Sequence, residues 1–291
     1  MKNPVLTASG TFGFGREYNN FYNIGDLGAV CIKGLTLNER DGNKPSRVAE
    51  TPGGMLNSVG LQNPGVHAFI RDELPFLRSL STVIIANING NTIEEYCEIA
   101  EVLSHTGVDM LELNISCPNV KQGGIAFGVD SNMVERITSE VKKHSEIPII
   151  VKLSPNVTDI SEMAIAAEAG GADALSLINT LLGMRIDIKT RRPILHNNTG
   201  GLSGPAVKPV AVRMVWQVKN SVSIPIIGMG GISTGDDAIE FMLAGATAVA
   251  VGTACFMDPF APINVLNGIE SYMKENKIED VNELVGAVKP Y

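Results

Sequence analysis

With 291 residues and a hydrophobic fraction of 44%, the chain has ample material for one large buried core. Its net charge of −8 argues against nucleic acid or an anionic membrane surface as the main partner. No apolar run approaches the roughly 18 residues of a membrane span, and the first residues lack the apolar centre of a signal peptide. The cysteines are scattered, which excludes a zinc or iron–sulfur site within the chain and predicts a reducing, cytoplasmic compartment.

Two strand-like templates alternate along the chain and predict its architecture. One occurs at 81–87, 147–153 and 224–230, the other at 27–34, 107–114, 171–179 and 245–253, and the opening segment 4–10 makes eight. Continuous apolar runs are typical of parallel strands covered on both faces. Helical patterns lie between them, over 93–103 (with Thr92 and Glu95 as an expected capping box), 131–144, 160–169, 207–219 and 235–244.

Eight strand and helix units favour a closed barrel over an open doubly wound sheet. The open sheet would need an early G-x-G-x-x-G turn, and SGTFGFG (9–15) lacks that spacing. The sequence therefore predicts an α/β protein, a (β/α)8 TIM barrel, as a single domain over 1–291. Two connections rich in Gly, Asn and Pro, 34–80 after strand two and 180–223 after strand six, are expected to be long binding loops or lids over the barrel mouth.

Glycines after the last two strands predict a phosphate site. GMGGIST (228–234) precedes a helix, and VGTA (251–254) closes strand eight. Phosphate needs several backbone N–H groups at close approach, where a side chain would obstruct it. Tight turns alone would also explain a glycine pair, but two glycine corners on adjacent strands favour a phosphate at this corner of a barrel.

Polar side chains end several other strands. Lys33 and Lys152 could be solvated rim charges, or they could attract an anion, stabilise a negative cofactor ring or form a Schiff base. Asn87, Asn114 and Asn179 could be helix caps, but three amides at equivalent strand ends favour a lining for a planar ring with several hydrogen-bonding groups.

Cys117 follows strand four in a polar, glycine-rich loop, where a thiolate could act as nucleophile or base. The absence of a companion histidine weakens a Cys–His hydrolase. Cys31, Cys97 and Cys255 are expected to be small buried hydrophobic residues, and the four dispersed histidines are expected at the surface.

Extended motifs cover essentially the whole chain: NSVGLQNPG (57–65), LNISCPNVKQGG (113–124), VKLSPNVTDI (151–160), INTLLGMR (178–185), TGGLSGPAVKP (199–209) and GMGGI (228–232). Together and in this order they resemble the class 1 dihydroorotate dehydrogenases, specifically the NAD-linked class 1B catalytic subunit. The cysteine in the loop after strand four fits class 1, since class 2 enzymes, which are membrane-associated and use quinones, are expected to carry serine there. The family usually has a short hairpin before the first strand, whereas this chain begins almost at strand one, which puts the stability of the barrel floor in question.

The resemblance implies that FMN is the phosphate-bearing ligand and that the reaction is oxidation of dihydroorotate to orotate in pyrimidine biosynthesis. The FMN contacts that it implies are Ser9, Lys33, Gly34, Asn87, Asn114, Lys152, Ile178, Gly204, Gly230, Gly231, Gly252 and Thr253. The substrate contacts that it implies are Lys33, Asn57, Ser58, Val59, Gly60, Leu61, Asn114, Asn179 and Thr180. Cys117 would take the proton from C5 of dihydroorotate, FMN would take the hydride from C6, and Lys152 would stabilise the reduced ring.

Class 1B also implies a second subunit with FAD and a 2Fe–2S cluster that passes electrons to NAD, in a heterotetramer of two catalytic and two electron-transfer subunits. This chain has neither the cysteine spacing nor the dinucleotide fingerprint for that role. Three alternatives stay open: a fumarate-using class 1A enzyme, a Schiff-base lyase or aldolase barrel using Lys152, and a non-catalytic flavin- or nucleotide-binding protein.

Overall fold

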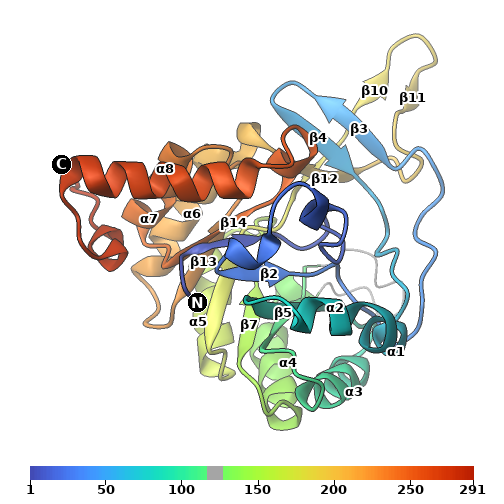
Figure 1. Ribbon diagram of the computed structural model, residues 1–291. Helices are drawn as coiled ribbons and strands as arrows, with labels where there is room; N and C mark the ends of the chain where they lie inside the picture. The colour runs from blue at the N-terminus through green and yellow to red at the C-terminus, as the bar shows by residue number, and fades with distance from the viewer. Residues whose placement is uncertain (117–126) are drawn as a thin grey trace.

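In the computed structural model, eight of the described strands run parallel and close into a barrel, as the alternating pattern predicts (Figure 1). The structure describes residues 1–116 and 127–291. Around the ring the strands lie in the order β1-β14-β13-β8-β7-β6-β5-β2, and the pair Leu6 and Ala29 closes the ring between β1 and β2. Their bounds are β1 (Val5–Thr7), β2 (Ala29–Cys31), β5 (Val83–Ile88), β6 (Met110–Asn114), β7 (Ile149–Lys152), β8 (Ala174–Leu177), β13 (Ile226–Met229) and β14 (Ala248–Val251).

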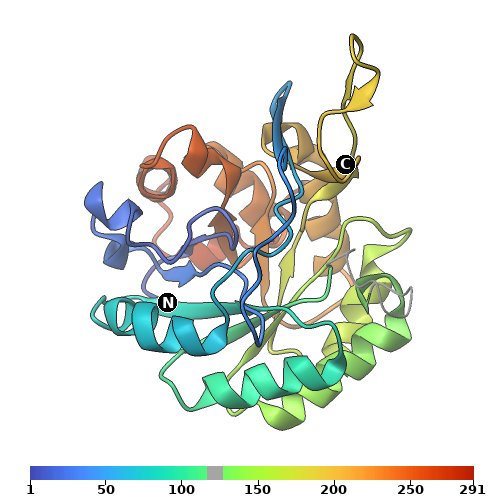
Figure 2. The same ribbon diagram turned by 90° about the vertical axis from the view of Figure 1, so that its right-hand side faces the viewer.

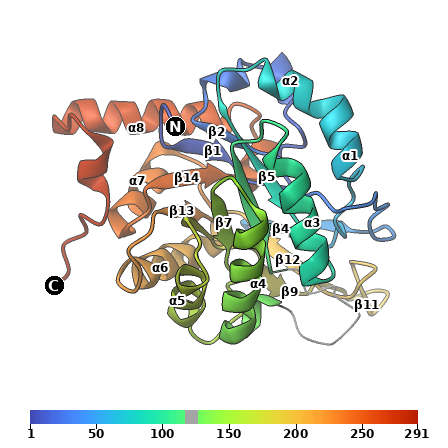
Figure 3. The same cartoon turned by 90° about the horizontal axis from the view of Figure 1, so that it is seen from below.

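Helices surround the strands, as the view from below shows (Figure 3). The longer helices are α3 (Ile93–Ser104), α4 (Ser131–His144), α5 (Ile160–Ala169), α6 (Lys208–Lys219), α7 (Gly235–Ala244) and α8 (Ala261–Asn276). After β2, α1 (Val66–Ala68), a π-helical turn (Phe69–Glu73) and α2 (Leu74–Arg78) form one continuous helical segment. Short 3-10 turns are η1 (Tyr18–Asn20), η2 (Ile24–Asp26), η4 (Phe127–Val129), η5 (Pro205–Val207), η6 (Thr253–Phe256) and η7 (Val281–Leu284).

Side-chain caps begin several of these helices, because the first N–H groups of a helix have no acceptor within it. Thr234 and Asp237 form a reciprocal capping box at α7. The expected box at α3 is only half present. Thr92 accepts from the N–H of Glu95, but the Glu95 carboxylate accepts from the N–H of Asn91 instead of that of Thr92.

The two long connections do not form independent lids, since they pair with each other in one antiparallel sheet. Its strands are β3 (Val48–Thr51), β4 (Gly54–Asn57), β12 (Gly200–Ser203) and β9 (Leu181–Gly183), hydrogen-bonded in that order. A separate hairpin of β10 (Ile186–Asp187) and β11 (Arg192–Pro193) extends from the same region. Both features project from one side of the barrel (Figures 1 and 2). They leave from the carboxyl ends of β2 and β8, so the sheet stands at the end where barrel enzymes carry their sites.

The barrel interior changes character from floor to mouth. Alternate residues of a strand point inward, and Leu6, Ile85, Ile150 and Ala248 belong to a compact apolar cluster separate from the larger core. That larger core lies between the strands and the helices. Polar side chains, among them Glu112, replace apolar ones toward the carboxyl ends of the strands. The apolar floor therefore supports a buried polar layer beneath the mouth.

Candidate active site

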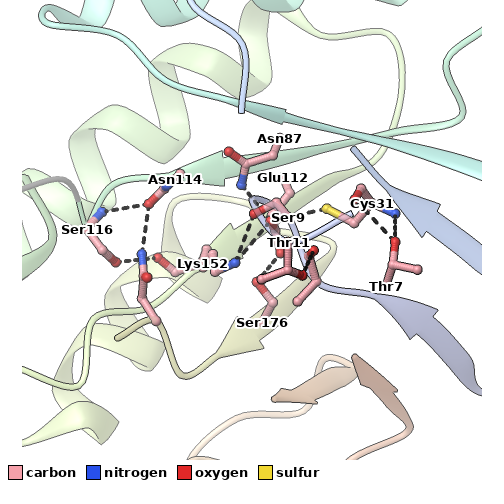
Figure 4. A network of polar contacts seen from close by, with 12 residues as sticks. Thr7, Ser9, Thr11, Cys31, Asn87, Glu112, Asn114, Ser116, Lys152 and Ser176 are labelled. Atoms are coloured by element: carbon pink, nitrogen blue, oxygen red, sulfur yellow. Dashed lines mark hydrogen bonds and ion pairs between the residues drawn. The ribbon is translucent and has the colours of Figure 1, made fainter. Parts of the chain in front are cut away.

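Glu112 is the centre of the buried polar layer, and side chains from four other strands converge on it (Figure 4). It lies on β6 and is 2% exposed. Its Oε1 accepts from Ser176 Oγ at 2.7 Å, and its Oε2 accepts from Asn87 Nδ2 at 2.6 Å. The same Oε2 lies 3.4 Å from Cys31 Sγ and 3.5 Å from Lys152 Nζ. The carboxylate is therefore fully satisfied although it is inside the barrel.

The electrostatics of this layer keep the carboxylate charged and the neighbouring thiol neutral. Burial alone would raise the pKa of the Glu112 carboxyl, but the Lys152 ammonium and the hydrogen bonds from Ser176, Asn87 and Cys31 outweigh it and hold the pKa below its usual range. Burial and the Glu112 carboxylate raise the pKa of the Cys31 thiol. Cys31 is thus buried as expected, and it also donates to Glu112.

Lys152 ends β7 and is only 4% exposed, so it is not a solvated rim charge. Its ammonium donates to Ser9 Oγ at 3.2 Å and faces Glu112. Both contacts are longer than the roughly 2.7–2.9 Å of a strong charge-assisted hydrogen bond. An ammonium has three donors, so Lys152 keeps capacity for another acceptor in the mouth.

Amide side chains line the wall formed by β5, β6 and the residues after β8. Asn87 accepts from Asn89 Nδ2 at 2.9 Å, and Asn114 accepts from Asn179 Nδ2 at 3.1 Å. Only glycine fits at position 34, because a Cβ there would lie 2.5 Å from Asn89 Nδ2. The Oδ1 of Asn89 is buried with no hydrogen-bond partner in the part of the chain that the structure describes. The predicted amide lining is therefore assembled by the fold, with part of its hydrogen-bonding capacity unused.

The four-stranded sheet brings the predicted substrate segment to the residues after β8. Asn57 lies opposite Gly201 in the register of β4 and β12, and its Nδ2 donates to the Gly201 carbonyl at 3.4 Å. A Cβ at Gly201 would meet Thr180 Oγ1 at 2.0 Å, so only glycine lets Thr180 pack there. Residues 57–61 are half-buried, and Asn43 holds the backbone of Ser58.

Lys33 follows β2 and is half-buried at the same end of the barrel. Burial and, to a lesser extent, the Arg47 guanidinium lower the pKa of its ammonium. The part of the chain that the structure describes gives the Lys33 side chain no hydrogen-bond partner of its own. An anionic ligand in the mouth would offset both causes of the lowered pKa, which fits the prediction of a lysine that faces an anion.

The glycine corner brings three segments together. Gly204 and Gly231 have φ of 101° and 88°, a region that favours glycine, and a Cβ at Gly231 would lie 2.9 Å from the Gly204 carbonyl oxygen. A Cβ at Gly230 would meet Ile178 at 3.1 Å. Thr253 Oγ1 donates to Ser203 Oγ at 2.8 Å, which ties the end of β14 to β12. The local pattern predicted two glycine corners, and the family resemblance also named Gly204; the structure brings Gly204, from the second long connection, against Gly231.

Two backbone N–H groups of this corner are available as donors to a ligand. Among the described residues, no hydrogen bond uses the N–H of Gly231 or of Gly252. Such unengaged donors next to glycine positions are what a phosphate requires.

Sequence reasoning missed Glu112 and Ser176, because it considered only residues at the strand ends. The signal was present in LELN (111–114), where Glu112 stands two residues before Asn114 and so points to the same interior face. The predicted base, Cys117, lies outside the described residues. The histidines are exposed, as expected.

Neither a metal-binding cluster nor a membrane-spanning helix is present among the described residues. Residues 1–116 and 127–291 contain no group of three or more His, Cys, Asp or Glu side chains that could hold a metal ion. No helix within those ranges is long and apolar enough to cross a membrane.

Comparison with known proteins identifies the family. A family model described as dihydroorotate dehydrogenase matches residues 1–273. The dihydroorotate dehydrogenase B (NAD(+)), catalytic subunit, of Alkaliphilus oremlandii is 63% identical over 286 residues, which are 98% of this chain and 95% of that protein. The proteins of the same name from Lachnoclostridium phytofermentans and Alkaliphilus metalliredigens are 59% and 61% identical over 289 and 288 residues, 99% of this chain in each case and 96% and 95% of those proteins. The chain therefore belongs to the dihydroorotate dehydrogenase family, among its NAD-linked B-type catalytic subunits.

Proposed function

We propose that this chain oxidises dihydroorotate to orotate in pyrimidine biosynthesis, at the mouth of the barrel and with FMN as its cofactor. One observation carries the proposal. A buried cation, Lys152, lies beneath a mouth that has a glycine corner on one side and an amide wall on another. This arrangement suits a ligand that has both a phosphate and a planar polar ring.

The residues present fit FMN. The unengaged N–H groups of Gly231 and Gly252 suit its phosphate, and the unpartnered Oδ1 of Asn89 shows unused polar capacity beside the wall. The residues proposed to hold FMN are Ser9, Lys33, Gly34, Asn87, Asn114, Lys152, Ile178, Gly204, Gly230, Gly231, Gly252 and Thr253. When bound, FMN supplies the acceptor for the hydride that leaves C6 of dihydroorotate.

The chain's own side chains would bind the substrate and move its proton. Asn114, Asn179 and Thr180 would orient the amide-like edges of the pyrimidine ring, with the segment 57–61 closing over it. Lys33 would balance the substrate carboxylate. Cys117 would take the proton from C5 as C6 loses its hydride, which leaves a double bond between the two carbons. Lys152 would place positive charge where the reaction delivers negative charge.

The electrons are expected to leave through a second protein. A separate subunit with FAD and a 2Fe–2S cluster would pass them to NAD, and two such subunits would join two copies of this chain in a heterotetramer. The designation of the relatives as catalytic subunits supports a division of labour of this kind. We further propose that residues 1–291 form one FMN-binding domain, since the insertions pair with each other above a single barrel.

An acceptor panel tests the proposal. The purified chain, reconstituted with FMN, is supplied with dihydroorotate and with fumarate, a quinone, or NAD in the presence and absence of the co-expressed partner subunit. Turnover with NAD only when the partner is present is the expected result, and turnover with fumarate would identify an A-type enzyme instead. Borohydride trapping of substrate on Lys152, without any oxidation, would favour a Schiff-base lyase and would contradict the proposal.

A further inference from the structure

Glu112 is a buried carboxylate, and its neighbours must replace the hydration that it loses. A carboxylate inside a barrel loses its hydration, and that loss is costly unless hydrogen bonds and an opposite charge replace the water. Ser176 of β8 and Asn87 of β5 supply short hydrogen bonds from strands on either side of β6, and these fix the plane of the carboxylate. Their groups are neutral. In the described part of the chain the positive charge that faces Glu112 comes from Lys152.

The geometry leaves one oxygen of Glu112 turned toward Lys152. Oε1 accepts from Ser176 at 2.7 Å, and Oε2, which accepts from Asn87 at 2.6 Å, is the oxygen that lies 3.5 Å from Lys152 Nζ (Figure 4). A lysine has a flexible four-carbon stem, so a cation at its end needs a fixed partner to stay in one place. Ser9 is the other partner, at 3.2 Å, and it carries no charge. Glu112 is therefore the charged anchor of the Lys152 ammonium.

We propose that Glu112 is a positioning residue for the reaction: it holds the Lys152 ammonium in place at the carboxyl end of β7, from where Lys152 is proposed to act on the bound cofactor. The inference rests on the proposed function, since it assigns Glu112 a role in that site. Glu112 acts through Lys152 and is not itself expected to contact substrate. Its effect on the rate should therefore depend on whether Lys152 is present.

A double-mutant cycle tests this dependence. The proteins are wild type, Glu112→Gln, Lys152→Met and the double variant, each loaded with FMN. The rate constant for flavin reduction by dihydroorotate is measured by anaerobic stopped flow. We expect Glu112→Gln to lower the limiting rate roughly 10- to 100-fold, with the dissociation constant of dihydroorotate changed less than about threefold. In the Lys152→Met background the same substitution should change the rate less than about twofold.

A second readout uses the protein without FMN. Removing one partner of a buried ion pair destabilises a protein strongly, whereas removing both can be nearly neutral. The unfolding equilibrium constant of each single variant should therefore exceed that of the double variant by at least roughly tenfold. Additive effects in this cycle would show that the two side chains do not act as a pair, and would overturn the inference.

Two further variants test the role of the Glu112 charge if Glu112→Gln does not fold. Glu112→Asp keeps the charge and should retain more of the reduction rate than Glu112→Gln. Ser176→Ala removes the hydrogen bond to Oε1 but leaves both charges, and should lower the rate much less than Glu112→Gln does. If Ser176→Ala slows reduction as much as Glu112→Gln, or if Glu112→Asp lowers the rate as much as Lys152→Met, the role is structural and the inference fails.

The failures are distinguishable. A wild-type chain that oxidises no dihydroorotate contradicts the proposed function, whereas an active wild type with a fully active Glu112→Gln variant overturns only the role of Glu112.

Discussion

The substitution Gly231→Ala tests the glycine corner most sharply. The new Cβ would lie 2.8 Å from Lys208 Cβ and 2.9 Å from the Gly204 carbonyl oxygen, and one of these neighbours is backbone. Alanine at a φ of 88° also costs roughly 1–2 kcal/mol in backbone conformation. Overpacking adds roughly 1–3 kcal/mol. The free energy of unfolding of the FMN-free protein should therefore fall by about 2–5 kcal/mol.

The same substitution should weaken the binding of FMN to the protein. Relief of the crowding moves the Gly231 N–H away from Gly204, and a lost hydrogen bond to a charged group is worth about 1.5–3 kcal/mol. That loss corresponds to a roughly 10- to 100-fold higher dissociation constant. The measurement is a titration of the apoprotein with FMN, followed by the flavin fluorescence, alongside denaturant unfolding.

Gly171→Ala is the matched control. Gly171 has a φ of 91°, but a Cβ there would meet only Lys142 Cγ, at an ordinary 3.5 Å. It precedes β8, at the end of the barrel opposite the mouth. We expect a loss of roughly 1–2 kcal/mol in stability with no change in FMN affinity. Unchanged FMN affinity in Gly231→Ala, or an equal loss in Gly171→Ala, would refute the assignment of this corner to the phosphate.

Two other predictions concern the proposed catalytic base and the stability of the protein in acid. Cys117→Ala should slow flavin reduction by dihydroorotate roughly 10²- to 10⁴-fold in stopped flow while FMN stays bound, because the C5 proton loses its acceptor; a rate within threefold of wild type would remove Cys117 from that role. The pKa of Glu112 is held below its usual 4.5 in the folded protein, so its charge contributes stability above that pH and the contribution is lost as the pH falls through the folded-state pKa. Denaturant unfolding from pH 6 to pH 3 should therefore show the stability difference between wild type and Glu112→Gln shrinking with acid, and a constant difference would contradict the assigned charge.

Local sequence patterns predicted the barrel because each strand is short, apolar and followed by a helical repeat. The helix over 131–144 and that over 235–244 were predicted at the bounds the structure has, since Asp130 and Thr234 cap their first turns and Gly245 follows the second helix. The family resemblance was confirmed by the relatives, and it named residues that the pattern alone could not assign.

The strand pairing between the two long connections could not be predicted from local sequence patterns. Asn57 and Gly201 are far apart in the chain, yet they lie opposite each other in the four-stranded sheet of β3, β4, β12 and β9. Strands of three or four residues give little periodicity, and register depends on partners that the sequence does not specify locally. The two insertions were therefore predicted as loops, and their mutual pairing came only from the structure.

The buried pair of Glu112 and Lys152 is the second feature that the sequence pattern did not predict. The glutamate of β6 stands in a run of leucines, where an acid is unexpected, and its partner Lys152 is on the next strand. Reading each strand with a period of two, from its end inward, would have placed Glu112 below Asn114 on the interior face. Burial of an acid in a strand is thus a signal of a charged partner nearby.

A single turnover without oxygen tests directly whether the chain oxidises dihydroorotate with FMN as acceptor. The wild-type chain, loaded with FMN and free of any partner subunit, is mixed with excess dihydroorotate while the flavin absorbance and the orotate formed are both followed. We expect full bleaching of the flavin and one orotate for each FMN. Flavin that stays oxidised while dihydroorotate is demonstrably bound, or bleaching without orotate, would contradict this expectation.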